Sequence, residues 1–128
     1  MAYVNSKIVN YTFEDAITKV TDELKKEGFG ILTEIDVQET LKNKLDVDFR
    51  KYKILGACNP TFAYKALQTE ETLGVLLPCN VVVQEKEDGK VQVSVVNPME
   101  SMQAVKNPAL EEVAVTVSSK LQKVLENL

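Results

Sequence analysis

The stretch that decides the fold reads Asn80-Val81-Val82-Val83-Gln84-Glu85-Lys86-Glu87, then Asp88-Gly89-Lys90, then Val91-Gln92-Val93-Ser94-Val95-Val96. Two β-branched runs joined through Asp-Gly predict an antiparallel hairpin. A two-residue turn would put the valines of the second strand on one face with Lys86, Gln84 and Val82. A three-residue loop, residues 88–90, puts them on one face with Glu87, Glu85, Val83 and Val81. The second register buries more apolar surface, so we expect the three-residue loop.

In the first third of the chain, the sequence predicts two strands that alternate with helices. Residues 4–11 interleave polar residues with Val, Ile and Tyr and predict a first strand. Thr12, with Asp15 three residues later, predicts the start of a helix that stops at Gly28. Residues 29–35 predict a strand with one apolar face, which carries Phe29, Ile31, Thr33 and Ile35. Asp36 followed by Glu39 predicts a short helix.

Three Asn-Pro pairs predict the remaining helix starts. Residues 52–58 predict a strand, after which Asn59 caps a helix with Pro60 at its first position. Asn97-Pro98 gives the same signal, and Asn107-Pro108 predicts the start of a terminal helix with an apolar side. The predicted order is therefore β-α-β-(α)-β-α-β-β-α. Helices interleaved with a hairpin favour an α+β class, with a single mixed or mostly antiparallel sheet against which the helices pack.

Length and composition predict one domain, residues 1–128, because 128 residues suit a single core. Nineteen acidic and fifteen basic side chains give a net charge of −4, which disfavours nucleic acid as a partner. No apolar run has membrane-spanning length, and residues 1–7 lack the pattern of a signal peptide. We therefore expect a cytoplasmic protein, with no membrane partner, in which Cys58 and Cys79 are thiols.

The chain contains no histidine, which removes several kinds of active site. Ser-His-Asp and Cys-His nucleophile pairs and histidine metal sites cannot be built from this sequence. Glycine-rich phosphate loops are also missing, because neither Gly-x-x-x-x-Gly-Lys-Ser/Thr nor Gly-x-Gly-x-x-Gly occurs.

Two Cys-Asn pairs beside prolines remain as the candidate site: Cys58-Asn59-Pro60 and Pro78-Cys79-Asn80. Cys58 precedes a predicted helix start, where the dipole and free N–H groups favour the reactive thiolate form. Whether Cys79 joins it is a question of geometry, since twenty-one residues separate the two.

Each candidate residue also has a simpler interpretation. Both cysteines can be small buried hydrophobic residues, and Asn59 can act only as a helix cap. Glu34 is a candidate ligand or base within a cleft, or an acid on an exposed strand face.

These segments also carry a family resemblance. The string Ile54-Leu55-Gly56-Ala57-Cys58-Asn59-Pro60, then Ala63 and Leu67, then residues 76–83, resembles the domain of unknown function 302 family. The resemblance implies a compact α+β sandwich that pairs as a homodimer, and it implies no reaction. The family motif falls on the residues already singled out, namely Cys58, Asn59, Pro60, Pro78, Cys79 and Asn80.

Two functions from different classes follow as expectations. The first is a binding module, acting as a homodimer, that holds a small ligand or a soft metal ion near the two Cys-Asn segments. Thiolates select zinc or copper(I), so those are the expected ions. The alternative is a thiol-dependent enzyme or redox sensor that uses Cys58. A third reading, a subunit that acts only through association, rests on the apolar side of the terminal helix.

Overall fold

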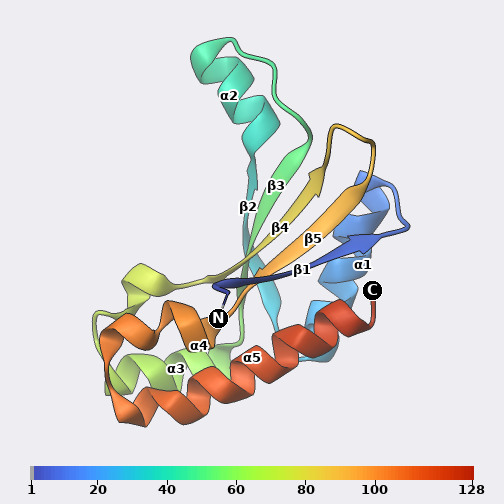
Figure 1. Cartoon of the computed structure of the whole chain (residues 1–128). Helices are drawn as coiled ribbons and strands as arrows, with labels where there is room; N and C mark the ends of the chain where they lie inside the picture. The colour runs from blue at the N-terminus through green and yellow to red at the C-terminus, as the bar shows by residue number, and fades with distance from the viewer. Residues whose placement is uncertain (1) are drawn as a thin grey trace.

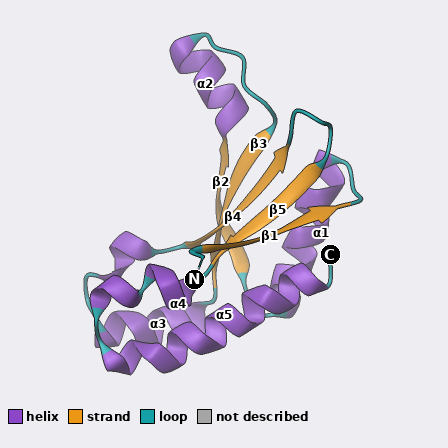
Figure 2. Ribbon diagram, viewed as in Figure 1, coloured by secondary structure: helices purple, strands orange, loops and turns teal. Residues whose placement is uncertain are grey.

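The computed structural model describes residues 2–128 and contains one antiparallel sheet (Figures 1 and 2). The strand order is β1-β5-β4-β3-β2. The α+β class and the order of elements agree with the prediction. The strands are β1 (Val4–Val9), β2 (Gly30–Asp36), β3 (Tyr52–Cys58), β4 (Cys79–Glu85) and β5 (Val91–Val96). The helices are α1 (Phe13–Lys26), α2 (Val37–Leu45), α3 (Pro60–Thr69), α4 (Pro98–Ser101) and α5 (Glu111–Glu126), with 3-10 turns η1 (Leu73–Leu76), η2 (Gln103–Val105) and η3 (Pro108–Leu110).

The β4–β5 hairpin has the predicted face and a loop one residue earlier than predicted. Val93 pairs with Val83 and Val95 pairs with Val81, so the valines meet on one side of the sheet. The amide of Lys86 donates to the carbonyl of Lys90 at 2.8 Å, which leaves residues 87–89 as the three-residue loop. Gly89 has a φ of +83°, a conformation that glycine adopts at little cost. The glycine therefore fixes the loop position.

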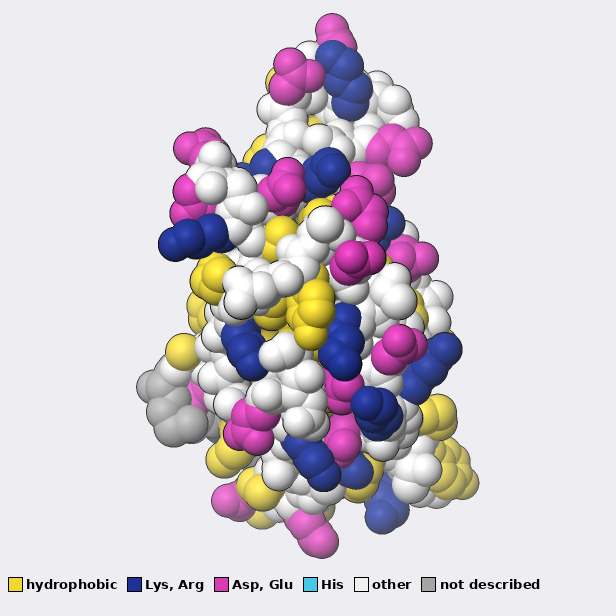
Figure 3. Space-filling model, turned by 90° about the vertical axis from the view of Figure 1, so that its right-hand side faces the viewer, with side chains coloured by type: hydrophobic (Ala, Val, Ile, Leu, Met, Phe, Trp, Pro, Cys, Tyr) yellow, Lys and Arg dark blue, Asp and Glu magenta, His cyan; other side chains and the backbone are white. Residues whose placement is uncertain are grey.

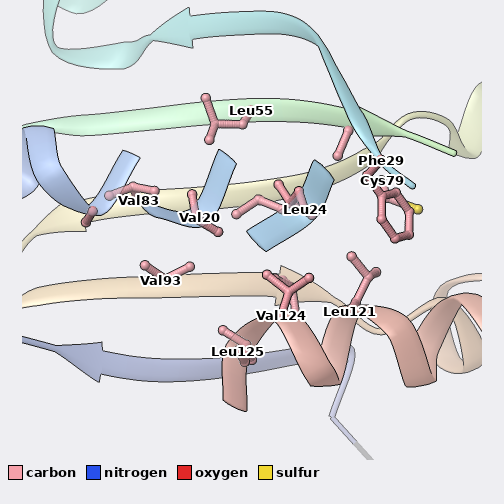
Figure 4. Packing of buried hydrophobic residues seen from close by; sticks show 14 of the residues in the cluster. Val20, Leu24, Phe29, Leu55, Cys79, Val83, Val93, Leu121, Val124 and Leu125 are labelled. Atoms are coloured by element: carbon pink, nitrogen blue, oxygen red, sulfur yellow. The ribbon is translucent and has the colours of Figure 1, made fainter. Parts of the chain in front are cut away.

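Helices α1 and α5 cover one face of the sheet and form the main core with it (Figures 1 and 4). Each helix presents one apolar stripe to the valines of β4 and β5, as its spacing predicts. Helices α3 and α4 lie beyond one end of the sheet beside α5, and α2 projects from the other end. The core consists of Val9, Phe13, Ala16, Val20, Leu24, Phe29, Leu55, Ala57, Cys79, Val81, Val83, Val91, Val93, Val95, Val117, Leu121, Val124 and Leu125.

Strand β2 departs from the predicted alternation. A bulge between Ile31 and Thr33 shifts the register, so that Ile31 pairs with Ala57 and Ile35 pairs with Ile54. The extra residue moves everything after Ile31 to the opposite face. Leu32 is 67% exposed and Ile35 is 47% exposed. The prediction of one continuous apolar face over residues 29–35 is therefore wrong beyond Ile31.

Local sequence signals place most helix starts correctly. The amide of Asp15 donates to Thr12 Oγ1 at 3.1 Å, and the amide of Glu39 donates to Asp36 Oδ1 at 3.0 Å. These bonds satisfy amide groups that the first helical turn leaves free. At Asn107-Pro108 the structure forms the 3-10 turn η3 first, and the long helix α5 begins directly after it.

Lys7 joins the edge strand β1 to the end of α5. Its Nζ donates to the carbonyl oxygens of Leu125, Glu126 and Leu128, at 3.1, 3.4 and 2.8 Å. An ammonium group at a helix C-terminus interacts favourably with the dipole and satisfies free carbonyls.

Lys7→Met should lower the free energy of unfolding by about 1–2 kcal/mol in urea denaturation. Lys25→Met, at an exposed position in the last turn of α1, is the control and should leave it within about 0.5 kcal/mol.

Candidate functional site

Strands β3 and β4 bring the two cysteines to one end of the sheet. Cys58 ends β3 and Cys79 begins β4. Ala57 pairs directly with Cys79, so the backbone of Cys58 lies one residue along the neighbouring strand. The chain between them forms α3 and η1, which carry it out beyond the sheet and back. The Cys58 and Cys79 segments, separated in sequence, thus lie side by side at the end of the sheet.

Both cysteines border one small cavity between the sheet end, α3 and α5. Its volume is about 30 Å³. Apart from the two thiols and Asn59, the lining side chains are hydrocarbon or thioether. Figure 4 shows the ring of Phe29 beside Cys79. The lining residues are Phe29, Ala57, Cys58, Asn59, Phe62, Ala63, Ala66, Leu77, Cys79, Met102, Val113 and Val117.

The two thiols differ in environment. Cys58 is half-buried, whereas Cys79 is 9% exposed and belongs to the main core. Burial, followed by the charge of Cys58, raises the pKa of the Cys79 thiol to about 11. A low-dielectric surrounding penalises the thiolate, and a neighbouring negative charge adds to that penalty. Cys79 is therefore a neutral thiol at neutral pH, and Cys58 is the more accessible group.

Asn59 stands at the predicted N-cap position of α3 but makes no capping hydrogen bond there. Its Nδ2 donates instead to the carbonyl oxygen of Glu27 at 3.3 Å. The side chain thus ties the start of α3 to the turn between α1 and β2. The prediction that Asn59 acts as a helix cap is correct for its position and wrong for its hydrogen bond, because the side chain bonds the carbonyl oxygen of Glu27 and no amide of α3.

Four other predicted residues do not border the cavity. Pro60 is exposed at the first position of α3. Asn80 is exposed and pairs with Gly56, and Pro78 packs against that same glycine. Glu34 pairs with Leu55, three residues from Cys58 along β3, and its Oε1 lies 3.9 Å from Lys53 Nζ. The structure therefore places Glu34 with a lysine rather than with the thiols.

The structure also brings in lining residues that sequence reasoning missed. Phe62 comes from α3, Met102 follows α4, and Val113 and Val117 come from α5. The apolar stripe of the terminal helix indicated that Val113 and Val117 would be covered. Nothing in the sequence around Met102 indicates that this residue lines the same cavity as Cys58 and Cys79.

The raised pKa of Cys79 gives a pH-dependent prediction. Unfolding returns this thiol to its usual pKa of roughly 8.5–9, below the folded value of about 11. Between those values the unfolded state loses the proton first, so stability is fully present below pH 9 and falls as the pH rises towards 11. Iodoacetamide should leave Cys79 unmodified at pH 8 in the native protein. Cys79→Ala should show a shallower loss of stability between pH 9 and 11 in urea titrations.

Fold and cavity together define a class of protein: a small α+β domain with one helix-covered sheet and a sulfur-lined apolar cavity at the sheet end. The model of the family described as "Domain of unknown function DUF302" matches residues 5–128. The chain therefore belongs to the DUF302 family, as its two Cys-Asn segments predicted.

A solved structure with the same family name and one further relative are similar to the chain. A crystal structure of an uncharacterized conserved DUF302 protein from Bacillus stearothermophilus has a TM-score of 0.92 at 29% identity, and the match covers 99% of this chain and 98% of that one. An uncharacterized protein of Aquifex aeolicus (strain VF5) is 30% identical over 91 residues, which are 71% of this chain. The match spans 57% of that relative's length. Neither name states an activity.

The surface outside the cavity has a mixed distribution of charges on the face shown in Figure 3. Lysine, arginine, aspartate and glutamate side chains are interspersed on the face shown in Figure 3. None of the helices within residues 2–128 combines the length and apolar content that a bilayer crossing requires.

Proposed function

We propose that the protein is a binding module that holds a small ligand or a soft metal ion in the cavity bordered by Cys58 and Cys79. One observation carries this proposal: two cysteines from separate segments border the same cavity, together with the side chain of Asn59. Thiolates and thioethers bind soft ions such as zinc and copper(I). Cys58 is half-buried, so part of this residue remains open to solvent.

Protection of Cys58 from alkylation tests the proposal. Purified, reduced protein is treated with iodoacetamide at pH 8 alone, with zinc(II), with copper(I) under argon, and with a panel of small thiol-binding compounds. We expect at least one of them to slow modification of Cys58 at least tenfold and to raise the unfolding temperature. Cys58→Ser and Cys79→Ser should abolish the thermal shift. The proposal fails if no metal or compound protects Cys58.

A second part of the proposal is that the module acts as a homodimer. The sheet face opposite α1 and α5 supports this, because none of its side chains within the described strands is charged. Ser6, Ser94, Val82, Ile54 and Ile35 form one row across it by strand pairing. Two copies with a net charge of −4 repel each other, and this repulsion is smallest when they associate through faces that carry no charge. By the same pairing and alternation, the full set is Val4, Ser6, Ile8, Gly30, Thr33, Ile35, Tyr52, Ile54, Gly56, Cys58, Asn80, Val82, Gln84, Gln92, Ser94 and Val96.

Light scattering coupled to size exclusion tests the dimer. We expect twice the mass of 14.3 kDa for the wild type and the monomer mass for Val82→Asp at the same concentration. Val75→Asp is the matched control, since Val75 is exposed in η1, outside the sheet. The measurement is made at about 100 µM protein, at which a dimer with a Kd of about 10 µM would still form. A monomer mass for the wild type at this concentration would refute the dimer.

The difference in access between the two thiols favours a second candidate function, a thiol-dependent enzyme or redox sensor that uses Cys58. Cys58 is half-buried directly before the start of α3, whereas Cys79 is buried. Reactive cysteines are often found at such a position, ahead of the first turn of a helix. Alkylation rates measured from pH 5 to pH 9 test this role. A Cys58 that does not react up to pH 9 would remove it.

A further inference from the structure

We propose that the cavity is a copper(I) site in which Cys58 and Cys79 supply two thiolates and Met102 supplies a thioether. This inference rests on the proposed binding function and names its ligand. The observation that carries it is the juxtaposition of three sulfur side chains around one cavity: one from the end of β3, one from the start of β4 and one from the turn after α4.

The donor atoms select a soft ion. Among the side chains that line the cavity, only Cys58, Cys79, Met102 and Asn59 carry atoms other than carbon, and the Asn59 amide already donates to the carbonyl of Glu27. Sulfur donors suit copper(I), whereas magnesium, calcium and manganese prefer carboxylate, carbonyl and water oxygens. The lining contains no carboxylate, so these harder ions have no anionic oxygen ligand there.

Coordination number separates copper(I) from zinc. Zinc in structural sites takes four ligands, drawn from cysteine, histidine, aspartate and glutamate. The chain has no histidine, and residues 2–128 contain no group of three or more such side chains that could hold a metal ion. Copper(I) is satisfied by two or three sulfur ligands, the number that this cavity presents. The cavity therefore lacks what zinc needs and has what copper(I) needs.

The size of the cavity separates a metal ion from an organic ligand. A volume of about 30 Å³ holds an ion or one water molecule, whereas organic ligands occupy sites of roughly 300–1,000 Å³. On binding, Cys58 and Cys79 each release a proton to solvent as their sulfurs coordinate the ion, and the copper keeps its oxidation state. The remaining negative charge lies beside the N-terminal end of α3, where the helix dipole favours it.

Anaerobic titration with copper(I) tests this assignment. Reduced full-length protein competes with bicinchoninate for copper(I), added as its acetonitrile complex. We expect one copper(I) per chain, with copper–sulfur scattering alone in X-ray absorption. Cys58→Ser and Cys79→Ser should each lower the affinity about 100-fold. Met102→Leu, which keeps the side-chain volume, should lower it about tenfold, in the range by which losing one supporting interaction weakens a metal site.

Met99→Leu is the matched control. Met99 lies on α4, is 41% exposed and does not border this cavity. It should leave the affinity unchanged, and circular dichroism should confirm that every variant is folded. The assignment is overturned if the protein does not retain copper(I), or if Met102→Leu binds it as tightly as the wild type. Zinc or compound protection of Cys58 without copper(I) binding would refute copper while the binding function stands. If nothing binds or protects, both proposals fail.

Discussion

Phe29→Ala is expected to lower the free energy of unfolding by about 3–5 kcal/mol, the usual cost of truncating a buried phenylalanine. Phe29 is 2% exposed, belongs to the main core and borders the sulfur-lined cavity. Its removal leaves the surrounding apolar side chains without contacts. The volume that the ring occupied adds to the existing cavity. Urea denaturation monitored by circular dichroism measures the loss.

The same variant gives a second readout. An enlarged, dry apolar cavity binds small apolar molecules such as benzene. Benzene should therefore raise the unfolding temperature of Phe29→Ala and leave that of the wild type unchanged. Phe49→Ala is the control, because Phe49 is half-buried in the loop before β3 and stacks on Arg50. It should cost about 1 kcal/mol or less. Equal losses in the two variants would contradict the packing described for Phe29.

Gly56→Ala is expected to lower the free energy of unfolding by about 2–3 kcal/mol, as overpacking of a filled interior does. Gly56 is a buried residue of β3. A methyl group there would meet Thr33 Oγ1 from β2 at less than contact distance, and Pro78 Cγ at 2.8 Å. The proline ring is rigid, so the strands must move apart to admit the methyl group.

Gly30→Ala is the matched control for that prediction. Gly30 lies on the neighbouring strand β2, and no atom outside its chain neighbours lies within 4 Å of an added Cβ. This change should be neutral or stabilise by up to about 1 kcal/mol, because alanine restricts the unfolded chain. If Gly56→Ala is as stable as Gly30→Ala, the close approach of Thr33 and Pro78 to Gly56 is wrong.

Local chemistry made much of the fold predictable. The valine alternation of β4 and β5 fixed which face of the hairpin is buried, because side chains on a strand alternate between faces. Thr12 and Asp36 marked helix starts, since a side-chain oxygen two or three residues from a free amide can bond it without help from distant parts of the chain. The DUF302 resemblance was readable for the same reason: both of its Cys-Asn segments are contiguous.

The register of β2 and the position of the β4–β5 loop could not be predicted from the residues of each segment alone. The bulge at Leu32 depends on how β2 meets β3, which already pairs with β4 on its other side. The hairpin loop begins at Glu87 because cross-strand pairs and the left-handed Gly89 together select it. In both cases the register is set by hydrogen bonds and side-chain contacts with another strand. The residues of the segment alone do not determine those interactions.

The sequence by itself determined the α+β class, the membership of a family and the absence of any histidine-based chemistry. Only the tertiary structure decided that Cys79 is buried beside Phe29, that Glu34 lies near Lys53 and not at the cavity, and that Met102 lines the same cavity as the two cysteines. Helix starts and strand alternation are set by neighbours in sequence, whereas burial and the composition of a cavity are set by packing between distant segments.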